Sequence, residues 1–276
     1  MKVAYGPRPG LGRGPSLALG MVTLWVSLVV LIPLAAVVAN AFGHGGSSFW
    51  HAVSNPEVVA ALKLTVGLSV GAALVNAVAG VVIAWVLVRE RFPGAKVLEF
   101  LVDLPFALPT IVTGVVMLGL YGVDSPLGVN LQGARAGLFV SLLFVTLPFT
   151  VRTVQPVLLN LDRDAELAAN SLGASPATTF RRIVAPTLLP AVCTGLGLAL
   201  ARALGEYGSL VLISSNLPFK TEVASSLIYG KLQNADDPAA TQQAAAIATV
   251  LLVAGVLLLI ALAVIQRRAV RRGQAA

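Results

Sequence analysis

The chain has 276 residues, of which 57% are hydrophobic and only 11% are charged, and its net charge is +7. Soluble domains carry about 25% charged residues, so this composition excludes a soluble globular protein and indicates a multi-pass protein of the lipid bilayer. The basic residues flank apolar runs, as topology signals do, and no aromatic-basic platform accompanies them, which argues against nucleic acid as a partner.

Six segments are long and apolar enough to cross a bilayer, whose core of about 30 Å needs roughly 20 such residues in a helix. Helices are expected because each spanning segment must pair its own backbone groups, and the ten-residue alternation of membrane strands is missing. We therefore predict an all-α polytopic membrane protein. The membrane domain covers 17–266, with spans at about 17–42, 58–88, 99–122, 136–158, 187–214 and 243–266.

The first predicted span has some features of a secretory signal peptide. It follows the basic residues Lys2, Arg8 and Arg13, and the tripeptide 39–41 reads Ala-Asn-Ala. A cleavable apolar region is usually about 7–15 residues long, whereas this one is longer. We interpret it as an uncleaved membrane anchor.

The distribution of Lys and Arg predicts the topology. Of the 19 such residues, fourteen lie in segments that face one side if the spans alternate, and three (Arg135, Lys220 and Lys231) face the other. Positive charge is retained on the cytoplasmic side of membrane proteins. We therefore expect the N-terminal tail 1–16 and the basic tail 267–276 to be cytoplasmic.

The longest cytoplasmic connection, residues 161–186, is here named the elbow, and its first half predicts a short helix. Asp162 or Asp164 can cap the start of this helix, and Gly173 can end it. One helical face is made of small side chains, which permit close approach by another surface. That face carries Ala165, Ala168, Ala169 and Leu172.

The second half of the elbow predicts another helix. Ser175 is a suitable N-cap, Pro176 suits the first helical position, and Pro186 is expected to stop the helix. Phe180 and Ile183 give it apolar side chains. Two readings stay open from the residues alone: an amphipathic connection lying on the membrane face, or a docking surface for a cytoplasmic partner.

The elbow resembles the coupling loop of permeases from ATP-binding-cassette (ABC) importers. Their EAA motif reads E-A-A, three residues, G, nine residues, I-x-L-P; here Leu167 replaces the glutamate, Glu166 stands one residue early, and Ala185 replaces the leucine. One residue rotates a helical side chain by about 100°. The resemblance implies the type I importer permease fold and contacts to an ATPase. The ATPase-coupling residues it implies are Glu166, Ala168, Ala169, Gly173, Phe180, Ile183 and Pro186.

Residues 201–232 are similar to the sulfate/thiosulfate importer permeases, specifically the T-type subunit, through Gly-Glu-Tyr-Gly at 205–208 and Asn-Leu-Pro-Phe-Lys-Thr-Glu at 216–222. Molybdate permeases are the alternative within the same group. The resemblance implies a heterodimer with a homologous W-type permease, two ATP-binding subunits and an extracytoplasmic sulfate-binding protein. It implies that ATP and Mg are used by the partner ATPase and that this subunit holds no cofactor.

The sequence contains no motif for catalysis. The phosphate-binding G-x-x-x-x-G-K-[ST] loop, H-E-x-x-H and G-x-S-x-G are all missing, and we find no cluster of metal-binding side chains. We therefore expect a non-enzymatic permease. A carrier or channel driven by an ion gradient is the alternative from another class, but its coupling carboxylates would have to be Asp103 and Glu206.

Arg202 and Glu206 are four residues apart in the fifth span. A charge near the bilayer centre costs at least about 2.5–3.5 kcal/mol, so such residues face a cavity or each other. We predict a translocation pathway at Arg202, Gly205, Glu206 and Tyr207, and a local ion pair is the alternative. The same span contains several small residues, which let another helix approach closely: Gly195, Gly197 and Gly208. They would serve either a helix that slides against its partner during transport or static packing alone.

The connection 214–241 is the longest on the outer side, and loops of this length are uncommon without a function. It offers two cations, Lys220 and Lys231, and several hydroxyl groups. We predict that Asn216, Lys220 and Thr221 contact the solute-binding protein or form a gate beneath it.

Overall fold

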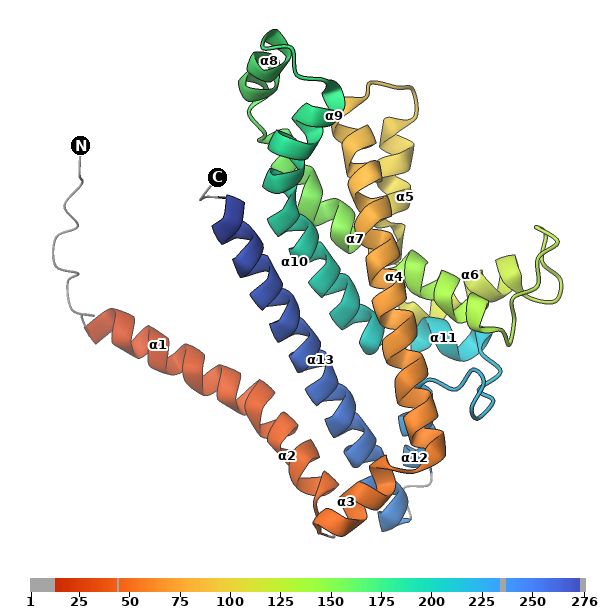
Figure 1. The fold of residues 1–276 in the computed structure, drawn as a ribbon. Helices are drawn as coiled ribbons and strands as arrows, with labels where there is room; N and C mark the ends of the chain where they lie inside the picture. Colours follow the sequence, from red (N-terminus) through yellow and green to blue (C-terminus); the bar gives the residue numbers. More distant parts are fainter. Residues whose placement is uncertain (1–12, 44, 234–236, 274–276) are drawn as a thin grey trace.

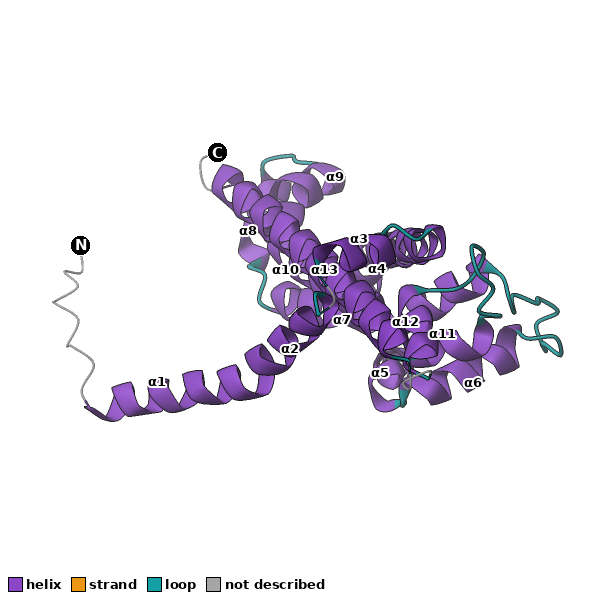
Figure 2. Ribbon diagram, turned by 90° about the horizontal axis from the view of Figure 1, so that it is seen from below, coloured by secondary structure: helices purple, strands orange, loops and turns teal. Residues whose placement is uncertain are grey.

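The computed structural model of the chain describes residues 13–43, 45–233 and 237–273. The first twelve residues of the predicted tail 1–16 and the last three of the tail 267–276 lie outside the described residues. Every regular element in the described part is helical, which confirms the all-α fold class (Figure 1, Figure 2).

Five helical stretches are long and apolar enough to cross a membrane, and one bent pair makes a sixth if it counts as a single span. The first is built from α1 and α2, joined by a π-helical turn at Ser27–Leu31. The bounds of the helices that form the five stretches are α1 (Arg13–Val26), α2 (Ile32–Ala41), α4 (Pro56–Arg89), α7 (Arg135–Leu159), α9 (Pro176–Thr179), α10 (Ala185–Leu204) and α13 (Pro238–Gly273).

The helices α4, α7 and α10 pack against one another and form the core of the molecule. At one end of the bundle the buried side chains include Ala84, Val151, Val154 and Leu188. Toward the other end they include Ala72, Leu138, Leu142 and Leu210. These aliphatic contacts replace lipid or water around each helix and hold the three helices at fixed positions.

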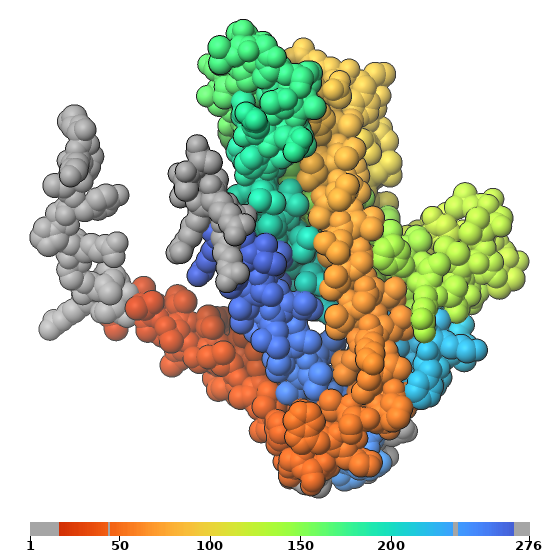
Figure 3. Space-filling model, viewed as in Figure 1, coloured from red at the N-terminus to blue at the C-terminus, as the bar shows by residue number. Residues whose placement is uncertain are grey.

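Among the described residues, the first span packs against the rest of the chain through its C-terminal helix, α2. Ala41 of α2 is buried with Phe49 of α3 (Gly46–Val53) and Ala246 of α13. By contrast, none of the most apolar 18-residue window of 17–41 is buried, and α1 projects away from the bundle (Figure 1, Figure 3). Its apolar side chains are therefore available to lipid or to another chain.

The predicted third span, 99–122, is broken into two helices. The structure has α5 (Ala95–Ala107) and α6 (Thr110–Tyr121), which are bent by 120° relative to each other. The break follows from Pro109, which has no N–H to donate and which disfavours helical backbone in the residue before it. Leu108 accordingly has an extended backbone, with φ −87° and ψ 131°.

The predicted fifth span, 187–214, is wrong in its C-terminal bound. The helix α10 ends at Leu204, and a separate short helix, α11 (Gly208–Ile213), follows after Gly205. The second helix begins here because the Glu206 carboxylate accepts a hydrogen bond from the backbone N–H of Ser209, at 2.8 Å. An acidic group that satisfies a free N–H stabilises a helix start.

The prediction that Pro186 stops the second helix of the elbow is wrong. The elbow contains α8 (Arg163–Ser171) and α9, and from α9 the helix continues through a π-helical turn (Phe180–Val184) into α10. In that turn the Ala185 N–H bonds the Phe180 carbonyl five residues back. The wider turn directly before Pro186 accommodates a ring that a regular helix would exclude.

The bundle has two distinct ends, joined by α4 along their whole separation (Figure 1). The elbow end carries α8, α9 and the C-terminal ends of α4 and α13, and the loop end carries α3 and α12 (Ala224–Leu232). The connection 214–241 is therefore partly helical, with α12 packed on α13 and α4.

Candidate functional site

The two helices of the elbow begin at side-chain caps and meet at a glycine. Asp162 accepts a hydrogen bond from the N–H of Asp164 at 2.9 Å, and the Ser175 hydroxyl accepts one from the N–H of Thr178 at 3.3 Å. Gly173, between them, has φ +81°, which side-chain-bearing residues rarely adopt. These local signals fix the corner at the position that the sequence predicts.

The alanine face of α8 is left uncovered by this chain. Ala165 and Ala168 are exposed, Ala169 is half-buried, and Leu172 at the end of the same face is 88% exposed. Beside this face lies a groove of about 500 Å³ between the end of α7 and the elbow, to which Ala165 and Ile183 contribute. The elbow therefore presents a small-residue surface and an adjoining hollow.

Glu166 points back toward the bundle rather than outward with the alanine face. Its carboxylate pairs with Arg89, the last residue of α4, at 2.5 Å, and the two side chains are only 18% and 13% exposed. The Arg89 guanidinium lies 5.1 Å from the ring centre of Trp85, and that ring meets Phe180 edge-on at 5.6 Å. We name Trp85, Arg89, Glu166 and Phe180 the latch.

The latch explains the shifted glutamate in structural terms. At its observed position Glu166 reaches Arg89, a residue 77 positions away in sequence. In the sequence, Arg89 is one of the fourteen basic residues on the predicted cytoplasmic side, and nothing local marks a partner so distant. Of the remaining predicted coupling residues, Ile183 is half-buried in the π-helical turn and Pro186 is exposed at the start of α10.

Arg202 and Glu206 form the ion pair that their spacing allows, with 2.9 Å between Nη2 and Oε2. The Glu206 side chain is fully buried, whereas about a third of the Arg202 side chain is exposed. The ring of Tyr207 lies 5.0 Å from that of Tyr229 in α12. Gly205 borders an apolar hollow of about 360 Å³ against α12 and α13. The Arg202–Glu206 ion pair thus lies at the break between α10 and α11.

The 214–223 loop is tightly bonded. Asn216 and Phe219 both have positive φ, at 46° and 63°, and the Ser226 hydroxyl donates to the Asn216 side-chain oxygen at 2.6 Å. Thr221 is 2% exposed, so it serves inside the loop, whereas Lys220 is exposed. Arg135 of α7 donates to the carbonyls of Lys220, at 2.8 Å, and of Phe219, at 3.1 Å.

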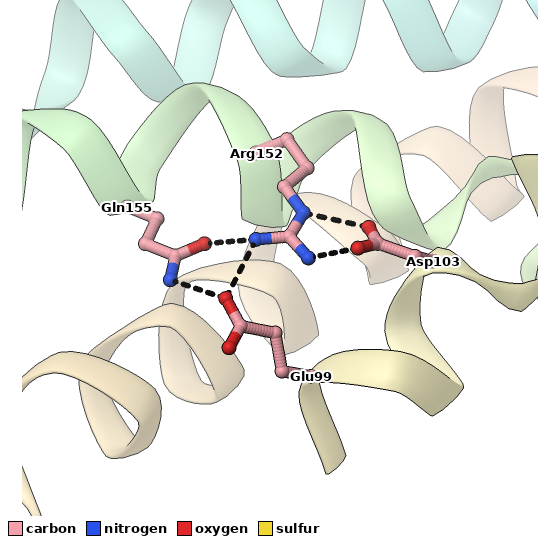
Figure 4. A network of polar contacts seen from close by, with 4 residues as sticks. All are labelled: Glu99, Asp103, Arg152 and Gln155. Atoms are coloured by element: carbon pink, nitrogen blue, oxygen red, sulfur yellow. Dashed lines mark hydrogen bonds and ion pairs between the residues drawn. The ribbon is translucent and has the colours of Figure 1, made fainter. Parts of the chain in front are cut away.

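A polar network joins α5 and α7 (Figure 4), and the sequence did not predict it. Arg152 donates through Nε to Asp103 at 2.7 Å and through Nη2 to the other oxygen of the same carboxylate. Its Nη1 donates to Glu99 at 3.2 Å and to Gln155 at 2.7 Å. Asp103 is thus committed to an ion pair. Within the described part of the chain no three His, Cys, Asp or Glu side chains are grouped to hold a metal ion.

Comparison with known proteins identifies the family. The profile of the family described as "Binding-protein-dependent transport system inner membrane component" matches residues 76–272, which include the latch residues from α4 and the elbow. The chain belongs to this family. It is therefore a multi-pass inner-membrane component of an ABC importer, and the expected resemblance to ABC permeases is confirmed.

Relatives of the permease extend over almost its full length. It is 41% identical over 266 residues to the sulfate transport system permease protein CysT of Salmonella typhimurium, covering 94% of this chain and 95% of the relative. The CysT protein of Synechocystis sp. is 41% identical over 251 residues, covering 88% and 86%. The resemblance to sulfate permeases that the 201–232 segment indicated is therefore confirmed.

Solved structures confirm the fold. A bacterial ABC transporter that imports the acidic polysaccharide alginate matches with a TM-score of 0.75 at 16% identity, covering 93% of this chain and 96% of that one. The MetNI methionine ABC transporter, in an inward-facing conformation, matches with a TM-score of 0.58 at 20% identity, covering 78% and 95%. At these identities the likeness concerns the fold of the permease alone.

Proposed function

We propose that the permease is the membrane-spanning subunit of an ATP-driven importer that moves sulfate and thiosulfate into the cell. The observation that carries this proposal is the 41% identity over 94% of the chain to a protein named as a sulfate transport permease. A molybdate or tungstate importer is the competing assignment within the same family. An extracytoplasmic binding protein delivers the substrate to the permease. Both termini of the permease are cytoplasmic.

The proposed assembly contains a homologous W-type permease, two ATP-binding subunits and a sulfate-binding protein. Two uncovered surfaces support it: the small-residue face of the elbow and the exposed apolar first span. A relative of known structure was solved as an alginate ABC transporter with its periplasmic protein. The permease itself carries out no bond chemistry and holds no cofactor, and ATP and Mg are used by the partner ATPase.

The remaining site assignments belong to the same proposal. The elbow residues contact the ATPase, and the alanine face of α8 forms the main part of that contact. Arg202 is partly exposed beside its buried partner Glu206 and lines the pathway where α10 breaks. Lys220 and the backbone of the 214–223 loop meet the binding protein, while Asn216 and Thr221 hold the loop in shape.

The function is tested by uptake of radiolabelled sulfate in cells with and without the gene, with unlabelled thiosulfate and molybdate as competitors. We expect sulfate uptake to depend on the gene. An excess of unlabelled thiosulfate should reduce it, whereas the same excess of molybdate should not. Uptake that is blocked by molybdate but not by thiosulfate would assign the importer to molybdate. Unchanged sulfate uptake in the deleted strain would contradict the sulfate assignment.

The docking role of the elbow is tested by Gly173→Arg. No atom lies within 4 Å of a Cβ built at Gly173, so the side chain fits, but the residue must hold φ +81°, which costs roughly 1–2 kcal/mol and shifts the corner. We expect normal membrane insertion with loss of ATPase co-purification and of uptake. Gly94→Arg is the matched control, because Gly94 has φ +99° and equal space outside the elbow. Wild-type co-purification and uptake from Gly173→Arg would contradict docking at this corner.

A further inference from the structure

A hollow of about 440 Å³ at the loop-end half of α4 combines two cations with apolar walls. One wall is a face of α4 that includes Lys63, Leu64 and Gly67, and the other is formed by Arg135 and Phe219. The charged side chains that line it are both basic. It is distinct from the Arg202–Glu206 pair and from the latch.

Arg135 is held in place on this hollow by the loop above it. Its Nε and Nη2 bond the carbonyls of Lys220 and Phe219, and its Nη1 has no hydrogen-bond partner among the described residues. The same two bonds hold Phe219 at φ +63°, a conformation that costs energy and persists only where surrounding contacts impose it. The guanidinium is therefore preorganised, with donor capacity remaining.

Lys63 supplies the second charge from within a membrane helix. It lies seven residues after the start of α4, about 10 Å along the helix, and its ammonium has no carboxylate partner in the described part of the chain. A cation in such a position is costly unless an anion or water compensates it. Here the side chain is exposed toward the hollow, where an incoming anion can provide that compensation.

The chemistry of the hollow fits a compact, doubly charged oxyanion. An ammonium acts as a point charge, and a guanidinium offers directed N–H donors to oxygen atoms on one face of a tetrahedron. Walls of low polarity strengthen both interactions, because they focus the field of the two cations. The 214–223 loop contributes Phe219 to the wall of the hollow, so a protein bound at that loop would release its anion beside these cations.

We propose that this hollow is the entry subsite for the tetrahedral oxyanion, with Lys63 and the free Nη1 of Arg135 as its ligands. The proposal rests on the proposed function and deepens it. Gly67, one turn after Lys63, leaves a Cβ-sized space on the same wall, with no atom within 4 Å. The subsite holds the dianion between its release by the binding protein and its passage along α4.

The test uses the complete importer in proteoliposomes with its binding protein, and compares wild type, Lys63→Gln and Lys63→Arg. The readouts are the rate of radiolabelled sulfate uptake and the ATPase activity stimulated by the loaded binding protein. For Lys63→Gln we expect uptake reduced by roughly tenfold, as for loss of one charge-assisted contact, with stimulated ATPase retained. Lys63→Arg should keep most uptake. Lys231→Gln, on the same side but outside the hollow, is the matched control.

Each remaining outcome overturns one identifiable statement. Wild-type uptake by Lys63→Gln overturns the subsite, as does an equal loss in Lys231→Gln. Loss of stimulated ATPase together with uptake in Lys63→Gln assigns Lys63 a structural role and also overturns it. If the wild-type importer moves molybdate but not sulfate, the proposed substrate is wrong, and the same variants then test the subsite with molybdate.

Discussion

The carboxylate of Glu166 belongs to the latch, and this is the residue-scale feature that most changes the view of the elbow. An exposed ion pair is worth about 0–1 kcal/mol, but this pair is largely buried and continues into the contact of Arg89 with Trp85. Removing one partner of such a pair leaves an uncompensated charge away from water. The latch therefore joins the elbow to the end of α4 at one defined place.

The latch is tested by exchanging its charges. Arg89→Glu should place two carboxylates together, detach the elbow and abolish most uptake, whereas the double variant Arg89→Glu with Glu166→Arg should restore part of it. Arg91→Glu, on the exposed connection two residues later, controls for the loss of a positive charge. Uptake and co-purified ATPase are the measurements. If the double variant is as inactive as Arg89→Glu, the pair does not hold the elbow.

Glu222, in the 214–223 loop, predicts a pH dependence of stability. Burial, followed by the neighbouring carboxylate of Glu57, raises the pKa of Glu222, and Lys231 opposes this only in part. An acid with a raised pKa binds its proton more tightly in the folded protein than in the unfolded chain. Stability is therefore lost as pH rises from the ordinary carboxyl pKa of about 4.3 through the raised value.

Glu222→Gln should remove this loss. We expect a higher thermal unfolding temperature than wild type at pH 8, with the difference shrinking as the pH falls toward and below the ordinary carboxyl pKa, where Glu222 becomes protonated in both states. The measurement is thermal unfolding of the detergent-purified permease across this range, with Glu90→Gln as an exposed control. A difference that is the same at every pH would mean that the carboxyl charge is not the cause.

At the scale of the elements, the three core helices pack through Thr150 of α7. A Cβ at Gly80 of α4 would lie 2.7 Å from the Thr150 Cβ, and a Cβ at Gly195 of α10 would lie 2.7 Å from its Cα. Thr150 thus fills a glycine gap on each side. Small residues at such crossings let helix backbones approach closely in a membrane.

Either gap should be intolerant of a larger side chain. Gly80→Val and Gly195→Val should each destabilise the permease by about 1–3 kcal/mol, because an overpacked interface forces the helices apart. Gly119→Val in α6 is the control, since nothing lies within 4 Å of a Cβ there. Thermal unfolding in detergent measures the effect. Equal unfolding temperatures for all three variants would show that these crossings can shift without loss.

The two broken spans also support each other. A Cβ at Gly114 of α6 would come within 2.8 Å of the Gly208 carbonyl oxygen of α11, so the two short helices touch at backbone distance. Each of them is too short to cross the bilayer, and each follows a break made by Pro109 or Gly205. Their mutual packing therefore adds tertiary support to two breaks that begin in the local sequence.

On the scale of the whole molecule, α4 connects the two ends at which partners are proposed. Its 34 residues extend about 51 Å, and the part from Lys63 at the cationic hollow to Arg89 in the latch accounts for about 39 Å of that length. The latch therefore joins the elbow to the helix that forms one wall of the proposed entry subsite.

This arrangement requires the elbow and the 214–223 loop to face opposite sides of the membrane. We predict that Lys220→Cys is labelled by an impermeant maleimide in intact spheroplasts, whereas Arg181→Cys is labelled only after permeabilisation. The natural Cys193 is buried, which keeps the background low. Labelling of Arg181→Cys in intact spheroplasts would invert the topology.

The sequence by itself determined the class of protein, the main spans, the elbow with its corner at Gly173, and the family. These rest on composition, hydropathy and short-range spacing, which act over a few residues and can be read without the fold. Local rules were not enough where the surrounding structure decides whether a helix continues. Pro186 stays inside a continuous helix because a π-helical turn precedes it. The third and fifth spans bend where neighbouring helices support the break.

Only the tertiary structure decided which polar groups meet across distant parts of the chain. Arg89 and Glu166 are 77 positions apart, and Arg135 and Phe219 are 84 apart, so no periodicity relates the members of either pair. Their contacts exist because aliphatic packing of α4, α7 and α10 fixes where each helix ends. The elbow could be found from spacing, whereas the latch and the cationic hollow required the fold, because a contact between distant residues depends on the path of the whole chain.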